Sequence, residues 1–233
     1  MVHIPPQKRY ALGWYNEGVT HLSMHEYEES LSFFDRALRA VPDHPDFLVG
    51  KGEVLMAVGD YYEAYQLFIQ AATSEPENIR ALVMLGNALL KLDRPEPADE
   101  AFLAALTLNR YEGEAWLGHG IACHLLGKDE DARKAFQKAL NMSPNQPELM
   151  YYLAKTSSTD NEAIEYLIRG CRLDPENIDL LTEMAERLIR LGRYREAALF
   201  CTKAEKRCPG NTRIEALIGR CMDAMIQGAG VTP

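Results

Sequence analysis

The sequence predicts an all-α fold, a solenoid of stacked helical hairpins, on the basis of three observations. Glycine, phenylalanine and alanine each recur every 34 residues along the first two thirds of the chain. The three rows are Gly18, Gly52, Gly86 and Gly120; Phe34, Phe68, Phe102 and Phe136; and Ala37, Ala71, Ala105 and Ala139. A fixed period of this length is typical of a protein in which each repeat stacks on the next.

Each repeat is predicted to be two amphipathic helices joined by a short turn, since helices of three to four turns fit into half a repeat. Gly59, Gly127 and Gly192 mark the turns, because glycine suits the position just past a helix end. Proline ends the second helix, since it lacks an N–H group and disfavours helix in the residue before it. These prolines are Pro42, Pro76, Pro144, Pro175 and Pro209.

The 34-residue period sets the boundaries of the repeats along the chain. We place six repeats at residues 11–44, 45–78, 79–112, 113–146, 147–177 and 178–211, after an N-terminal tail at 1–10. A capping helix at 212–226 and a flexible tail at 227–233 follow. Gly86 on a first helix is expected to face Ala98 on the second helix, and Gly18 to face Ser30. Small residues at such crossings let helix axes approach closely.

Two repeats depart from the pattern. The fifth repeat is three residues shorter, and the segment from Ser157 to Asn161 replaces its glycine turn. Ala154 stands there in place of the crossing glycine. In the third repeat Arg110 occupies the place of the proline, so its second helix is expected to continue toward Tyr111.

The segment from Trp14 to Pro42 carries the pattern W-x-x-x-G-x-x-H…Y-x-x-S-x-x-x-F-x-x-A…P. This pattern resembles the tetratricopeptide-repeat (TPR) consensus, and the resemblance covers about 200 of the 233 residues. It implies a right-handed α-solenoid (superhelix) of six hairpins plus the capping helix, and a protein-binding scaffold or adaptor rather than an enzyme. It also implies that the first helices line a concave face, into which consensus positions 2, 5, 9 and 12 point.

Mapping those positions onto the first four repeats gives a predicted peptide-binding site. Its residues are Tyr15, Val19, Val49, Glu53, Met56, Arg80, Val83, Asn87, Leu90, Glu114, Leu117, Ile121 and His124. The apolar floor is expected to consist of Val49, Val83, Leu117 and Ile121, ringed by Glu53, Asn87 and Glu114. A contiguous exposed apolar strip marks a binding surface. The alternative is that these side chains pack on neighbouring repeats.

The expected partner is a protein helix or peptide that presents apolar anchors. Acidic residues outnumber basic ones on the predicted face, so basic flanks on the partner would be attracted. Some TPR domains bind acidic chaperone tails through a lysine at position 5, which no repeat here has. A rival interpretation is a self-assembling structural protein, with residues 227–233 of one copy in the groove of another. A third is a regulatory domain of a larger enzyme.

Composition excludes other classes of function. The net charge is −9, with 34 acidic and 25 basic residues, which argues against sequence-independent nucleic-acid binding and against binding to an anionic membrane. No run of 18 apolar residues predicts a transmembrane helix, and the first residues do not resemble a signal peptide. Five cysteines without C-x-x-C spacing predict free thiols in a reducing compartment, hence a cytoplasmic protein.

Few residues suggest chemistry, so we expect no enzyme activity, no cofactor and no metal. His119 and Cys123 are spaced i, i+4 on one predicted helix and could share a metal ion, but a third ligand is expected to be missing nearby. We expect His119 and Cys123 to be packing residues of the repeat instead. Cys201 and Cys208 could have a redox role, although buried structural thiols are favoured. The sequence holds no phosphate-binding, dinucleotide-binding or nucleophile-elbow motif.

Overall fold

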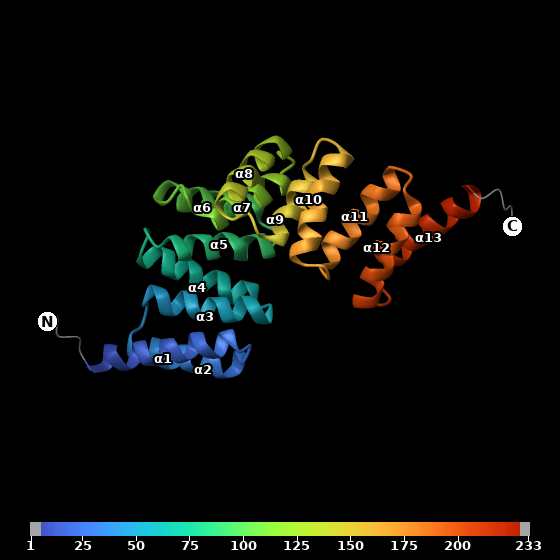
Figure 1. The fold of residues 1–233 in the computed structure, drawn as a ribbon. Helices are drawn as coiled ribbons and strands as arrows, with labels where there is room; N and C mark the ends of the chain where they lie inside the picture. Colours follow the sequence, from blue (N-terminus) through green and yellow to red (C-terminus); the bar gives the residue numbers. More distant parts are fainter. Residues whose placement is uncertain (1–5, 229–233) are drawn as a thin grey trace. The chain divides into compact units, whose positions relative to one another are not determined.

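The computed structural model describes residues 6–228, and the regular structure there is entirely helical (Figure 1). Its helices are α1 (Pro6–Ser23), α2 (Tyr27–Ala40), α3 (Pro45–Val58), α4 (Tyr61–Ser74), α5 (Ile79–Lys91), α6 (Pro95–Leu108), α7 (Gly113–Leu125), α8 (Asp129–Met142), α9 (Pro147–Lys155), α10 (Asp160–Leu173), α11 (Ile178–Arg190), α12 (Tyr194–Arg207) and α13 (Thr212–Gly228). The all-α prediction is confirmed, because no strand occurs in the described range. Within that same range, no helix is both long and apolar enough to cross a membrane.

The chain divides into two compact units, residues 1–128 (unit 1) and residues 129–233 (unit 2). The division falls in the fourth predicted repeat, after α7. In unit 1 each helix packs against the next, and the first helices α1, α3, α5 and α7 also contact one another in a row. In unit 2 the helices α8 to α13 follow the same rule, with α9, α11 and α13 forming the row of first helices.

Two helix ends differ from the prediction at the chain termini. The first helix begins at Pro6, so residues 6–10 belong to α1 and are not a tail. Proline is well tolerated in the first turn of a helix, because the N–H group that it lacks has no partner there. The last helix continues to Gly228, two residues beyond the predicted cap. The remainder of the predicted tail, 229–233, lies outside the described residues.

Two internal helix ends also differ. Helix α6 ends at Leu108 and does not continue toward Tyr111. The Asn109 side chain accepts a hydrogen bond from the Tyr111 N–H group at 3.0 Å, so a local turn stops the helix without proline. Helix α10 begins at Asp160, because Thr159 caps it by accepting a hydrogen bond from the backbone of Glu162 at 3.3 Å.

The phenylalanine row forms the centre of the hydrophobic core. Phe34, Phe68 and Phe102 are completely buried. A Cβ atom added to Gly86 would lie 2.6 Å from the Phe102 ring, and one added to Gly118 would overlap the same ring. The glycine at a crossing therefore makes room for this ring, and Ala98, the alanine expected to face Gly86, is buried in the same cluster as Phe102. In the first repeat the Ser30 hydroxyl donates to the Gly18 carbonyl at 2.7 Å, so that facing pair is confirmed.

We expect Gly86→Ala to destabilise the protein by about 1–3 kcal/mol, the usual effect of overpacking a core. The Phe102 ring cannot move aside, because Gly118 closes its other side. Gly13→Ala is the control, since no atom lies within 4 Å of the added methyl group and helix propensity favours alanine by about 0.5–1 kcal/mol. Urea denaturation measures both free energies of unfolding. Equal values for the two variants would contradict this packing.

Candidate functional site

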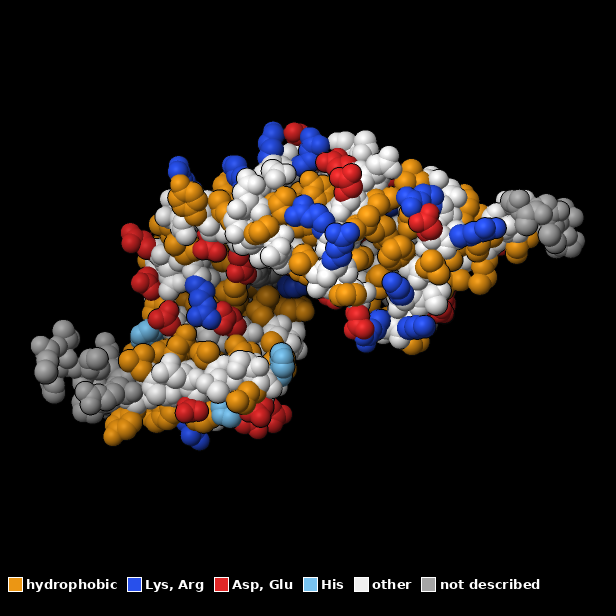
Figure 2. Space-filling model, in the orientation of Figure 1, with side chains coloured by type: hydrophobic (Ala, Val, Ile, Leu, Met, Phe, Trp, Pro, Cys, Tyr) orange, Lys and Arg blue, Asp and Glu red, His pale blue; other side chains and the backbone are white. Residues whose placement is uncertain are grey.

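All thirteen residues of the predicted peptide site lie on α1, α3, α5 and α7, the row of first helices in unit 1. Their side chains differ greatly in exposure. Val19 is 39% exposed, while the apolar or aromatic side chains at intermediate burial are Tyr15, Met56, Leu90, Ile121 and His124. The polar members Arg80 and Glu114 are exposed, and Glu53 and Asn87 are half-buried. Hydrophobic and acidic side chains are interspersed over the face of unit 1 seen in Figure 2.

The predicted apolar floor is not at the surface. Val49, Val83 and Leu117 have exposed fractions of 0%, 3% and 6%. Val49 lies in one hydrophobic cluster with Ala81 of α5, and Val83 lies in another with Ala115 of α7. At this position α3 is thus covered by α5, and α5 is covered by α7. The expectation of an exposed floor at these three residues is wrong, and Ile121 alone of the four reaches the surface.

A polar cluster joins three successive first helices. The Arg80 guanidinium on α5 donates two hydrogen bonds to the Glu53 carboxylate on α3, at 2.9 and 2.6 Å. It donates a third to the Tyr15 hydroxyl on α1 at 3.3 Å. Burial alone would lower the pKa of Arg80, but the hydrogen bonds and charge of Glu53 outweigh it and raise that pKa. This cluster holds three repeats in a fixed register.

The same arrangement recurs farther along the chain. The Asn87 amide on α5 donates to the Glu114 carboxylate on α7 at 3.0 Å. In unit 2, Arg213 on α13 bonds Glu186 on α11 at 2.8 Å. Each pair is separated by 27 residues, which is the spacing from position 9 of one repeat to position 2 of the next. The sequence therefore did carry a signal of these contacts, namely complementary polar residues 27 residues apart. Mapping each consensus position by itself did not use this signal.

A second polar cluster, in unit 2, is buried. It was not predicted from the sequence. Glu183 is fully buried on α11, and its carboxylate accepts from Arg187 one turn later at 2.7 Å. Arg187 also donates to Asp160 at the start of α10, at 3.1 Å. Lys155 Nζ lies 3.4 Å from the other Glu183 oxygen, at an angle that makes no hydrogen bond. Because α9, α10 and α11 all contribute, the group ties the short fifth repeat to the sixth.

The expectation that His119 and Cys123 lack a third ligand is wrong. Asp99 on α6 comes into direct hydrogen-bond contact with His119 Nδ1 on α7. The Cys123 sulfur lies 3.8 Å from the same nitrogen, so three metal-binding types of side chain converge. Sequence spacing could not show this, since Asp99 belongs to another helix. In unit 2, burial raises the pKa of the Cys201 thiol to about 12, which supports the structural interpretation of that cysteine.

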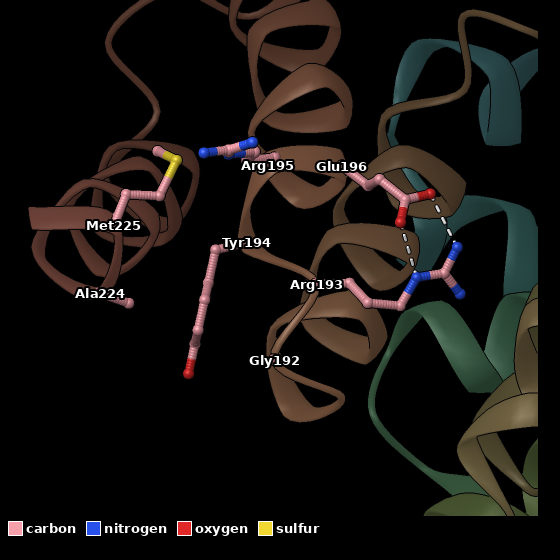
Figure 3. Close-up of a pocket in the computed structure, with 7 residues that line it drawn as sticks. All are labelled: Gly192, Arg193, Tyr194, Arg195, Glu196, Ala224 and Met225. Atoms are coloured by element: carbon pink, nitrogen blue, oxygen red, sulfur yellow. Dashed lines mark hydrogen bonds and ion pairs between the residues drawn. The ribbon is translucent and has the colours of Figure 1, made fainter. Parts of the chain in front are cut away.

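A pocket of about 410 Å³ lies in unit 2, where the start of α12 faces the end of α13. Figure 3 shows Tyr194 pointing into the space beside Ala224 and Met225, with the Arg193–Glu196 pair directed away from α13. Arg193 donates to both Glu196 oxygens at 2.7 Å, so these charges satisfy each other. The described residues that line this pocket include no nucleophile with an adjacent base. A smaller pocket of about 290 Å³ lies among charged side chains of α8 and α10.

Comparison with known proteins identifies the fold. The family model for the tetratricopeptide repeat matches residues 15–82 and 83–147, more than half of the chain. The Cut9–Hcn1 hetero-tetramer of the APC/C has a TM-score of 0.86 at 17% identity, over 94% of this chain and 44% of that chain. PilF of Pseudomonas aeruginosa has a TM-score of 0.77 at 19% identity, over 91% and 98%. YrrB has a TM-score of 0.56 at 26% identity, over 73% and 90%.

No curated protein matches the chain. The chain spans less than half the length of the matched Cut9–Hcn1 chain. The family and the fold are typical of non-enzymatic scaffolds, and the fold supports a general role in protein–protein interaction. The helical pairs and the family match together confirm the predicted TPR solenoid class, and the chain belongs to the tetratricopeptide-repeat family.

Proposed function

We propose that this protein is a scaffold or adaptor in which the first helices of unit 1 bind a segment of a partner protein. The observation that carries the proposal is the cluster of Tyr15, Glu53 and Arg80, which joins α1, α3 and α5 at the surface. A surface that is organised before binding loses little conformational entropy when the partner arrives. The buried residues Val49, Val83 and Leu117 support this surface from below and do not contact the partner.

The proposed partner is a peptide or helix with apolar anchors. Exposed Val19 and half-buried Met56 and Ile121 offer apolar contact area, and the half-buried Asn87 amide offers hydrogen bonds. The exposed acidic residues Asp46 and Glu114 on the same helices favour a partner with basic flanks. YrrB, which has a similar structure, is a TPR protein with an unusual peptide-binding site, so the same class of ligand occurs on this fold.

We expect Val19→Asp to weaken peptide binding at least about tenfold, because it places a charge in the apolar part of the site. The probe is a set of peptides selected on the wild-type protein from a random library, with Kd measured by fluorescence anisotropy. Leu103→Asp is the matched control, since Leu103 is 42% exposed on the second helix α6. Selected peptides should carry apolar anchors with Lys or Arg beside them and should bind this control normally.

If both variants lose affinity equally, or if neither loses affinity, the peptide does not bind on the first helices. Light scattering at micromolar concentration tests the rival interpretation. We expect a monomer. A dimer that Val19→Asp dissociates would favour self-assembly through this face instead.

A further inference from the structure

The contact between α6 and α7 in unit 1 brings together three side chains of metal-binding type. Asp99 comes from α6, while His119 and Cys123 come from successive turns of α7. The Asp99 carboxylate and His119 Nδ1 form a direct hydrogen bond. The Cys123 sulfur lies 3.8 Å from Nδ1 and 3.9 Å from Nε2 of the His119 ring. One ligand atom from each residue lies within 4.8 Å of the others.

These side chains are held with little freedom. The Asp99 and His119 side chains are 17% and 15% exposed, and Cys123 as a whole is 2% exposed. The Trp116 ring contacts the His119 ring edge-on, with centroids 5.8 Å apart, and the Trp116 indole donates to the Arg110 carbonyl at 2.8 Å. The imidazole is therefore positioned from two sides, and the partly open carboxylate side leaves a path for an ion from solvent.

We propose that Asp99, His119 and Cys123 form a binding site for a divalent transition-metal ion, best matched by Zn²⁺. Thiolate, imidazole and carboxylate are the three ligand types that zinc takes in proteins, whereas Mg²⁺ and Ca²⁺ prefer oxygen ligands alone. Tetrahedral zinc with bonds of about 2.0–2.3 Å places ligand atoms about 3.3–3.7 Å apart. The sulfur-to-nitrogen distances need to change by only a few tenths of an ångström, whereas the Asp99 oxygen has to withdraw from Nδ1 to make room for the ion. Water completes the fourth position.

Charge balance supports the same ion. A thiolate and a carboxylate contribute two negative charges, which a divalent cation neutralises in a site that is mostly removed from water. On binding, the ion forms bonds to Oδ, Nδ1 and Sγ. The Cys123 thiol proton passes to water, and the Nδ1 proton that faces Asp99 moves by way of water to Nε2, so the His119 ring stays neutral. A catalytic thiol with the same three residue types would need access for a substrate, which 2% exposure does not give.

The test is a titration of the tag-free full chain, stripped with a chelator, with Zn²⁺ by calorimetry and with Co²⁺ by absorption spectroscopy. We expect one ion per chain and a thiolate-to-cobalt charge-transfer band. Asp99→Asn and Cys123→Ser should each weaken the Kd at least about 100-fold, and Cys123→Ser should remove the band. His21→Gln and Cys201→Ser are the controls. His21 forms a histidine–carboxylate pair with Glu26 at 2.6 Å that includes no cysteine. Cys201 is a buried thiol in unit 2, outside the proposed site.

The proposal is overturned if the wild-type chain binds no stoichiometric ion, or if bound Co²⁺ shows no thiolate band. It is also overturned if Asp99→Asn binds Zn²⁺ as tightly as wild type. Circular dichroism checks the fold of each variant. If Cys123→Ser does not fold, the proposal is tested by the thiolate band of the wild-type cobalt spectrum and by the Zn²⁺ affinity of Asp99→Asn. This inference concerns α6 and α7 only and does not depend on the proposed peptide site.

Discussion

Replacing Val83 with aspartate is expected to unfold unit 1, not merely to weaken binding of a partner. Val83 is 3% exposed and shares a hydrophobic cluster with Leu89, Phe102 and Ala115. The described members of this cluster carry no charge, so a carboxylate placed among them is uncompensated, and burying such a charge costs several kcal/mol. We expect a loss of about 4 kcal/mol or more, which is large against a total stability of about 5–15 kcal/mol.

Circular dichroism during urea denaturation measures the effect. Val19→Asp is the control, because it adds the same charge to the same row of first helices at a position that is 39% exposed. Its free energy of unfolding should stay within about 0.5 kcal/mol of wild type. If Val83→Asp were equally harmless, Val83 would face solvent, and the apolar floor predicted from the sequence would be restored.

The fold could be predicted because one period governs several residue types. Phe34, Phe68 and Phe102 recur with the glycines whose missing side chains make room for their rings, so packing and pattern have the same cause. Helix ends were less predictable. The period suggested a proline as the stop signal, but in the third repeat Asn109 ends α6 through a side-chain hydrogen bond. A single polar residue can do this locally and leaves no periodic trace.

The candidate site could be predicted only in part. Consensus position 5 identifies the face of a helix, but exposure depends on how much of that face the next repeat covers. The neighbouring α5 and α7 helices cover Val49 and Val83 completely or nearly so. Contacts between repeats had a usable signal, because Glu53 and Arg80 are complementary at a spacing of 27 residues. The contact of Asp99 with His119 had no such signal in the sequence, since it depends on how α6 lies against α7.

Arg187→Ala is expected to destabilise unit 2 by about 3 kcal/mol, near the lower end of the range for breaking a buried ion pair. The change leaves the fully buried Glu183 carboxylate without its hydrogen-bond donor, and it removes the contact with Asp160 that ties α11 to α10. Two cations remain within reach of Glu183. Lys155 lies at 3.4 Å and Arg190 at 3.9 Å, so the carboxylate keeps some compensation.

Arg193→Ala is the matched control in the same unit. Arg193, just before α12, also bonds a glutamate close to it in the sequence, with both contacts to Glu196 at 2.7 Å, but the pair is exposed and water replaces it. The melting temperature should therefore fall clearly for Arg187→Ala and hardly at all for Arg193→Ala. The double change Glu183→Leu with Arg187→Leu should recover most of the loss, because apolar side chains of similar volume can replace a buried ion pair at little cost. A double variant as unstable as Arg187→Ala would mean that these charges position the fifth repeat in a way that packing cannot replace.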